Sequence, residues 1–313
     1  MDAAPDLTLA ICTRNRPRLL EQLLGRIAPQ AERSGVRLLV VDSASDLDVA
    51  ADIAGRLAGR RFIDLIRLDR PGVSLARNAA LEATLTSWLG FIDDDELPPR
   101  DWLEQALALC SRLPADCAAC GGNTLPKWPD GARVPAIGWR WMQYLSVVER
   151  GGEFDQSDDP LFAIGHSVVR VSALRELGGF DRRLGRDGAN LLSGEEVLLV
   201  DQLIARGWRI WHSDRLTIEH MIEPERLTRN WVVQRAYWEG VTRARVLRIS
   251  DPAACRRLVR DVKRKAPLLR LLASVASERW ELDLRAAFAR GVLAESDRAR
   301  SDEGAPRLAS AAA

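Results

Sequence analysis

The sequence of 313 residues predicts an α/β fold, in which a mostly parallel sheet is flanked by helices. Three observations favour this fold. Short β-rich runs alternate with helical patterns through the first 125 residues. The runs are apolar on both faces, as strands buried in a parallel sheet are. Polar or acidic residues follow the runs directly, at the carboxyl ends of strands, where such sheets bind their ligands.

The expected strands are runs of apolar and β-branched residues, each ended by a polar group or a turn. They are Leu7–Cys12, Val36–Val41, Phe62–Leu68 and Trp88–Ile92. Helices are expected between them, because apolar residues recur there at helical spacing. The helices are Pro17–Ile27, a segment through Leu75, Ala79 and Glu82 after the turn Arg70-Pro71-Gly72, and Pro98–Leu113.

The alternation of strands and helices ends near Asn123. Residues 124–160 are rich in Pro, Gly and Trp and show no clear period, which is typical of a long functional excursion. Glu195–Arg206 is expected to be helical and to stop at Gly207. Residues 224–247 and 252–293 also follow helical patterns, so we expect a helical C-terminal extension.

Composition narrows the class of protein. The formal net charge of +1 gives no general attraction to nucleic acid, so no nucleic-acid partner is expected. No apolar stretch approaches the roughly 20 residues that span a bilayer. The N-terminus lacks the basic and apolar regions of a secretory signal, and the five scattered cysteines do not suggest a disulfide framework. We expect a cytoplasmic protein.

The most informative motif is Asp93-Asp94-Asp95-Glu96, which follows the apolar run Trp88–Ile92. Like charges at the end of a buried strand are costly unless a cation balances them. In an extended backbone alternate side chains share a face, so we expect Asp93 and Asp95 to converge and Asp94 to point away. Paired carboxylates are typical ligands of Mg²⁺ or Mn²⁺.

Six motifs, in order, resemble those of glycosyltransferase family 2, the inverting nucleotide-sugar enzymes of the GT-A fold. They are Ala10–Asn15, Val40–Ser45, Gly72–Asn78, Phe91–Asp95, Gly178–Asp181 and Ser193–Glu196. The resemblance covers about residues 7–245 and implies a Rossmann-like sheet. It divides the chain into a nucleotide-sugar-binding half (1–125), an acceptor half (126–248), the helical extension (249–295) and a flexible tail (296–313).

The resemblance implies a set of donor-binding residues. Thr13 and Arg14 match positions that hold the base and ribose, and Asp42 matches the carboxylate that accepts a hydrogen bond from uracil N3–H. An acceptor there could instead meet guanine, and the simpler alternative for Asp42 is a helix cap. Arg77 would reach the nucleotide, with an ordinary surface arginine as the alternative.

The acidic motif then corresponds to the Asp-x-Asp signature of the family. Asp93 resembles the residue that touches the ribose. Asp95 resembles the direct ligand of a Mn²⁺ or Mg²⁺ cofactor that bridges the two phosphates, and Asp94 assists it. His220 resembles the histidine that completes the metal ligands, although a lone histidine is more often structural.

Glu195 and Glu196 form a second acidic pair at the start of a predicted helix. The resemblance implies that Glu196 is the general base toward the acceptor hydroxyl and that Glu195 binds the acceptor. The family usually has Glu-Asp here, so the choice between the two glutamates stays open.

Three further features are candidate contacts to the acceptor, the donor and a membrane. Trp139 and Trp141 could form an acceptor platform for sugar rings, with core packing as the alternative. Arg235 lies in a Gln-Arg-x-x-Trp spacing similar to one that holds acceptor and diphosphate in processive members, so it is a candidate donor ligand. Arg256–Lys265 is basic and amphipathic, and could hold the protein at the inner membrane face or be a solvated helix.

The sequence therefore predicts an inverting, metal-dependent glycosyltransferase. It would use a nucleoside-diphosphate sugar, a UDP-sugar before others, and a hydroxyl on a glycan, a lipid-linked glycan or another glycoconjugate. One alternative is a sugar-phosphate nucleotidyltransferase, which would need a glycine-rich basic loop that Thr13–Pro17 lacks. The other is a binding module without catalysis, which the joint presence of Asp93, Asp95 and Glu196 disfavours.

Overall fold

The computed structural model describes residues 6–134, 142–188, 190–275 and 280–304. The chain divides into two compact units. Unit 1 comprises Met1–Ala189 and Glu195–Leu227, and unit 2 comprises Asn190–Gly194 and Thr228–Ala313.

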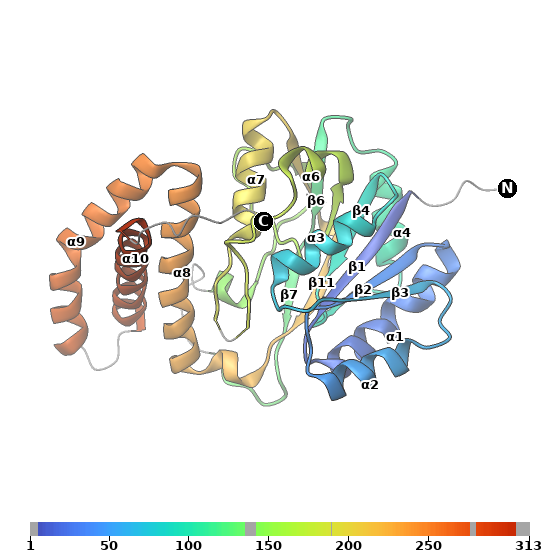
Figure 1. The fold of residues 1–313 in the computed structure, drawn as a ribbon, viewed down its shortest axis with the longest axis horizontal. Coiled ribbons are helices and arrows are strands. Elements are labelled where there is room, and N and C mark those ends of the chain that lie inside the picture. Colours follow the sequence, from blue (N-terminus) through green and yellow to red (C-terminus); the bar gives the residue numbers. More distant parts are fainter. Residues whose placement is uncertain (1–5, 135–141, 189, 276–279, 305–313) are drawn as a thin grey trace, which may run out of the picture. The chain divides into compact units, whose positions relative to one another are not determined.

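Unit 1 is built on a mixed eight-stranded sheet in the order β3-β2-β1-β4-β9-β6-β10-β8. Figure 1 shows its neighbouring strands β1, β2 and β3 side by side. The strands are β1 (Leu7–Thr13), β2 (Arg37–Asp42), β3 (Ile63–Arg67), β4 (Trp88–Ile92), β6 (Cys117–Gly121), β8 (Glu153–Asp155), β9 (His166–Arg170) and β10 (Arg209–Ser213). The first four run parallel, as expected. β9 is antiparallel to both β4 and β6 and joins the parallel part to the rest of the sheet.

Helices cover both faces of this sheet. Those of unit 1 are α1 (Pro17–Ser34), α2 (Leu47–Leu57), α3 (Val73–Ala83), α4 (Trp102–Cys110), α6 (Val171–Leu177) and α7 (Glu195–Ala205). α1 begins at a proline that fits a first helical turn, as expected, but it continues past Ile27 through Pro29. It ends at Gly35, whose φ of 68° closes the helix. α4 is shorter than the expected helix Pro98–Leu113 at both ends, and a short strand, β5 (Glu96–Leu97), precedes it.

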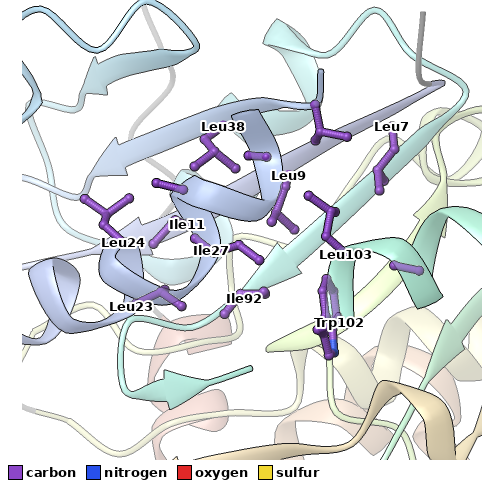
Figure 2. Close-up of a cluster of buried hydrophobic side chains, with 14 of the residues drawn as sticks. Leu7, Leu9, Ile11, Leu23, Leu24, Ile27, Leu38, Ile92, Trp102 and Leu103 are labelled. Atoms are coloured by element: carbon purple, nitrogen blue, oxygen red, sulfur yellow. The ribbon is translucent and has the colours of Figure 1, made fainter. Parts of the chain in front are cut away.

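The core has two halves because alternate residues of the strands face opposite ways. Leu7, Leu9 and Ile11 of β1 pack toward α1 and α4, where Trp102 is fully buried (Figure 2). Ala10 belongs to a second buried cluster that includes residues of α3, α6 and α7. Two-sided burial confirms the strand type that the apolar runs predicted for β1, β2 and β4. β3, at the edge of the sheet, differs: each of its residues is half-buried or exposed.

A second sheet of three strands positions the residues after the acidic motif. Its order is β5-β11-β7, with β11 (Ile218–Met221) between β5 and β7 (Thr124–Lys127). β11 is antiparallel to β5 and places His220 opposite Glu96. The N–H of Met221 also donates to the backbone oxygen of Asp95, at 2.8 Å. This pairing joins segments that are far apart in the sequence.

Unit 2 consists mainly of three helices, α8 (Arg229–Ser250), α9 (Pro252–Val275) and α10 (Trp280–Gly304). α8 and α10 pack closely at two glycines: a Cβ at Gly240 would lie 2.1 Å from the backbone oxygen of Phe288. Buried Glu295 of α10 pairs with Arg245 and Arg248 of α8. Among the described residues, no helix combines the length and hydropathy needed to cross a bilayer.

The helical character expected for the C-terminal extension is confirmed, because two helices, α9 and α10, follow α8. The compact units divide at Leu227/Thr228, so α8 groups with the extension by its contacts. The functional boundaries expected at 125/126 and 248/249 stay predictions. Those boundaries concern roles, and the tail expected at 296–313 lies partly outside the described residues.

Candidate active site

The acidic motif does not continue β4 in extended form. Residues 93–95 make a turn, in which the N–H of Glu96 donates to the backbone oxygen of Asp93, at 3.1 Å. The alternation expected for an extended strand therefore fails. Asp94 and Asp95 both contact Arg16, so Asp94 does not point away from Asp95. The prediction that Asp94 diverges was wrong because it assumed strand geometry past Ile92.

Asp93 faces a different cation from the other two aspartates. Its carboxylate lies 3.4 Å from Arg77 and is 41% exposed, so it remains accessible to a ligand. Its backbone N–H donates to the oxygen of Gly165, at 2.7 Å. A Cβ at Gly165 would lie 2.5 Å from Asp93 Oδ2, so this approach requires glycine.

Asp94 and Asp95 are buried and depend on close partners. Thr13 Oγ1 donates to Asp94 Oδ2 at 2.7 Å, and Arg16 bridges Asp94 Oδ1 (3.1 Å) and Asp95 Oδ2 (3.2 Å). Burial and the charge of Asp95 raise the pKa of Asp94 to about 7. Burial also raises the pKa of Asp95, but the contact with His220 and the charges of Arg226 and Arg16 outweigh it. The net pKa of Asp95 lies well below its usual range.

The structure places His220 beside Asp95, and the metal-ligand role that the resemblance implied for both stays a prediction. His220 Nε2 lies 3.5 Å from Asp95 Oδ2. A third residue, Arg226, contacts both: its guanidinium lies 3.0 Å from Asp95 Oδ2 and 3.2 Å from His220 Nε2. Arg226 comes from a short 3-10 helix, η3 (Pro224–Leu227), and is 5% exposed.

We tested whether these residues fit a divalent cation. Within the described part of the chain, no cluster of three or more His, Cys, Asp or Glu side chains could hold a metal. Asp95 and His220 supply two ligands, an oxygen and an imidazole nitrogen, and the buried Nδ1 of His220 has no hydrogen-bond partner. Mg²⁺ and Mn²⁺ sites that use substrate phosphates need only one or two protein ligands. The donor set fits an ion of that kind.

Asp42 ends β2 and is fully buried. Arg67 Nη1 donates to its Oδ2 at 2.7 Å, and the N–H of Ser45 donates to its Oδ1 at 2.9 Å. The helix after it, α2, is preceded by Asp46 and not by Asp42, so the helix-cap alternative does not describe Asp42. Arg14 lies at the end of β1 and donates from Nε to the oxygen of Ala44, at 3.4 Å.

The second acidic pair begins a helix, as expected. α7 starts at Glu195, directly after Gly194 with its φ of 95°. Arg77 Nη1 donates to Glu195 Oε1 at 2.7 Å, and both side chains are buried. Burial and the charge of Glu195 raise the pKa of Glu196 to about 8. The two glutamates therefore differ: one is held by an arginine and the other is a stronger base.

Arg77 links the two acidic groups of unit 1. It is 3% exposed and contacts both Asp93 and Glu195. Its guanidinium also lies over the rings of Phe91 (6.0 Å) and Phe180 (5.7 Å). The expected contact of Arg77 with the nucleotide stays a prediction. The surface-arginine alternative is wrong, because the side chain is buried.

A further buried histidine and the remaining predicted residues have varied surroundings. His166 is fully buried between Glu96 Oε1 (3.2 Å) and the oxygen of Gly122 (3.1 Å). Arg235 belongs to unit 2, where it contacts Ser193 Oγ and Glu239. Its expected role at the diphosphate is untested. Trp139 and Trp141 lie outside the described residues, so the acceptor platform also stays a prediction.

Sequence reasoning missed three arginines that contact the candidate ligands: Arg16, Arg67 and Arg226. Arg16 directly follows the motif Thr13-Arg14-Asn15 at a strand end, and this position could have marked it. Arg67 ends β3 next to β2, where register pairs it with Asp42. Arg226 carried no local signal, because its contact with Asp95 spans 131 residues.

Comparison with known sequences gives a consistent result. A sequence model described as Glycosyl transferase family 2 matches residues 8–178. Succinoglycan biosynthesis protein ExoM of Rhizobium meliloti (strain 1021) is 27% identical over 253 residues, which are 77% of this chain and 75% of that protein. The pre-mycofactocin glycosyltransferase of Mycobacterium tuberculosis (strain ATCC 25618 / H37Rv) is 27% identical over 254 residues. That match covers 80% of this chain but 49% of the relative's length.

Solved structures share the fold. The mannosyltransferase PcManGT from Pyrobaculum calidifontis, in complex with GDP-Man and Mn²⁺, aligns with a TM-score of 0.59 at 18% identity. The alignment covers 96% of this chain and 89% of that one. GalNAc-T7 with UDP, GalNAc and Mn²⁺ aligns with a TM-score of 0.55 at 12% identity, over 78% of this chain and 51% of that one. At these identities the likeness concerns the fold.

Proposed function

The chain belongs to glycosyl transferase family 2, and from this we propose an inverting, metal-dependent enzyme that transfers a sugar from a nucleoside-diphosphate sugar to a hydroxyl group. The donor is a UDP-sugar in the first instance. The acceptor is a glycan, a lipid-linked glycan or another glycoconjugate. The observation that carries the proposal is that buried Arg77 joins two distinct carboxylate groups, Asp93 on one side and Glu195 on the other.

The first carboxylate group serves the leaving nucleotide. The pKa of Asp95 lies well below its usual range, so this carboxylate is ionised at neutral pH. A carboxylate must be ionised to bind a metal ion. A divalent cation held by Asp95 and His220 would supply Lewis-acid stabilisation of the charge on the leaving diphosphate. Thr13 and Arg16 fix the Asp94 carboxylate beside it, and Asp93 is exposed enough to meet the ribose.

The second carboxylate group serves the acceptor. Glu196 is the proposed general base, because its pKa of about 8 makes it a better proton acceptor than an ordinary carboxylate. Glu195 is the proposed acceptor ligand. Its Oε1 is held by Arg77, while its buried Oε2 has no hydrogen-bond partner and can accept from a sugar hydroxyl. The acceptor oxygen then attacks the anomeric carbon in a single displacement, and Glu196 takes its proton.

Asp42, Arg14 and Arg77 complete the proposed donor site. Asp42 is already paired with Arg67, so a nucleobase that contacts the Asp42 carboxylate also contacts the Arg67 guanidinium. Arg67 is 37% exposed and therefore accessible to a base, on which a guanidinium plane can stack. Arg235 of unit 2 remains the proposed further contact to the diphosphate.

A thermal-shift panel tests the proposal. UDP-, GDP- and ADP-sugars are compared with and without Mn²⁺. We expect the sugar nucleotides of one base to raise the melting temperature, and to do so when Mn²⁺ is present but not without it. The released nucleotide is then identified. A nucleoside diphosphate supports glycosyl transfer, whereas pyrophosphate would indicate the nucleotidyltransferase alternative. Binding of a donor with neither transfer nor hydrolysis would indicate the non-catalytic module.

A basic surface on α9 is the proposed contact to the membrane that carries a lipid-linked acceptor. Arg256, Arg257, Arg260, Lys263, Arg264 and Lys265 are all exposed there. The same helix borders a cavity of about 520 Å³ in unit 2. Each cation near an anionic surface contributes about 1 kcal/mol. Co-sedimentation with phosphatidylglycerol vesicles should be strong at low salt and should fall in a K263E/R264E variant. Equal sedimentation of the two proteins would contradict the proposal.

A further inference from the structure

Arg226 occupies an unusual position among the candidate metal ligands. Its Nη2 lies 3.0 Å from Asp95 Oδ2 and its Nη1 lies 3.2 Å from His220 Nε2. Its Nε lies 3.4 Å from Glu223, which is 45% exposed. One buried guanidinium therefore contacts both atoms that the proposed function assigns to a divalent cation.

These contacts make the arginine and a metal ion mutually exclusive. A guanidinium can only donate, so at its contact with Arg226 the Nε2 of His220 presents a lone pair. Nε2 is the ring nitrogen that faces Asp95, at 3.5 Å from Oδ2, so a metal ion shared by the two residues would use that same lone pair and the same oxygen. The single lone pair of Nε2 cannot accept from a guanidinium and bind a metal ion at the same time. The arginine must leave when an ion binds.

A second arginine, Arg16, contacts the same carboxylate and is more exposed to solvent. Arg16 Nη1 lies 3.2 Å from the same Asp95 oxygen, and its side chain is 31% exposed. In the absence of a ligand, Asp95 therefore has two arginine contacts in addition to His220. The carboxylate is already neutralised, which lowers its attraction for a free divalent ion.

The displaced guanidinium needs a new anion nearby. A diphosphate held by an ion at Asp95 and His220 would lie next to Arg226 and Arg16, and arginine binds phosphate oxygens in bidentate fashion. We propose that Arg226 is a displaceable internal cation. It holds Asp95 and His220 while the donor is absent, and it pairs with the donor diphosphate once a divalent ion takes those two ligands. The second half of this statement rests on the proposed function.

Metal binding and nucleotide binding should then respond in opposite directions to the loss of Arg226. In R226Q, free Mn²⁺ no longer competes with the guanidinium, so its affinity without nucleotide should rise about tenfold, the scale of one charge contact at a partly hydrated site. The affinity for UDP or GDP at saturating Mn²⁺ should fall about tenfold, because a charged hydrogen bond to phosphate is lost. A purely structural residue would weaken both.

The experiment measures free Mn²⁺ by its electron paramagnetic resonance signal during titration of the protein, and nucleotide binding by calorimetry. R226K keeps the charge and should retain the wild-type affinity for Mn²⁺. R16Q removes the more exposed arginine and should also tighten Mn²⁺ binding, which keeps the test valid if R226Q does not fold. R56Q is the matched control, since Arg56 pairs with Asp52 on the exposed surface of α2.

Unchanged or weaker Mn²⁺ binding in both R226Q and R16Q would overturn the competition. Tighter Mn²⁺ binding with unchanged nucleotide affinity would overturn the contact with the diphosphate. The titration with Mn²⁺ alone needs no nucleotide. If the wild type binds Mn²⁺ but neither UDP nor GDP, the donor class of the proposed function is wrong. The proposed contact of Arg226 with the diphosphate is then wrong as well. The competition between Arg226 and the metal ion is still decided by the titration with Mn²⁺ alone.

Discussion

The buried pair of Arg77 and Glu195 gives the most quantitative prediction. The two side chains are 4% and 7% exposed, and Arg77 Nη1 lies 2.7 Å from Glu195 Oε1. R77M leaves the glutamate buried without its cation, which should lower the free energy of unfolding by about 3–5 kcal/mol. For a domain of this size, each kcal/mol corresponds to about 2–4 °C in Tm, so a fall of roughly 6–20 °C is expected.

The same reasoning predicts recovery when both charges are removed. In R77M/E195Q no uncompensated charge remains in the core, so the double variant should be more stable than R77M. Urea denaturation of the four proteins closes the double-mutant cycle. R37M is the matched control, because Arg37 and Asp64 form an exposed pair worth about 0.2–1 kcal/mol. The reasoning is refuted if R77M costs no more than R37M, or if the losses in R77M and E195Q simply add.

Two further predictions concern turnover. E196Q should reduce transfer by about 10²–10⁴-fold and leave nucleotide binding intact, because only the proton acceptor is lost. Since the base acts when deprotonated and its pKa is about 8, kcat/KM of the wild type should rise with pH through about 8, and E196Q should lose this rise. A wild-type profile flat between pH 6 and about 9 would contradict the assignment. D95A should abolish stimulation by Mn²⁺, and retained stimulation would place the ion elsewhere.

The sequence was sufficient for the elements that local patterns determine. The apolar run Trp88–Ile92 forms β4 with the expected ends, and Glu195 begins a helix as the acidic pair indicated. Continuous apolar runs indicate strands that are buried on both faces, and such strands are typical of a parallel sheet. The acidic motif was found for the same reason, because four consecutive carboxylates after such a run stand out.

The partners of those carboxylates could not be predicted from local patterns. Arg77 and Glu195 are 118 residues apart, and Asp95 and Arg226 are 131 apart. An arginine has no periodicity that marks it as buried, and the chain has many exposed arginines. The turn at Asp93–Asp95 was also missed, because its geometry depends on β11 pairing with β5 and on the close approach of Gly165.

The long chain separations within the candidate site have a consequence for folding. Contacts that span more than a hundred residues form only after much of unit 1 has collapsed, and parallel sheets with such contacts fold slowly. During synthesis, Asp95 leaves the ribosome long before Arg226 and His220 do. Until β11 and η3 dock, the nascent chain therefore lacks two contacts of Asp95, those with His220 and Arg226. The surroundings of Asp95 are therefore completed late in the folding of unit 1, and a chain that ends before residue 218 lacks His220, one of the two proposed metal ligands.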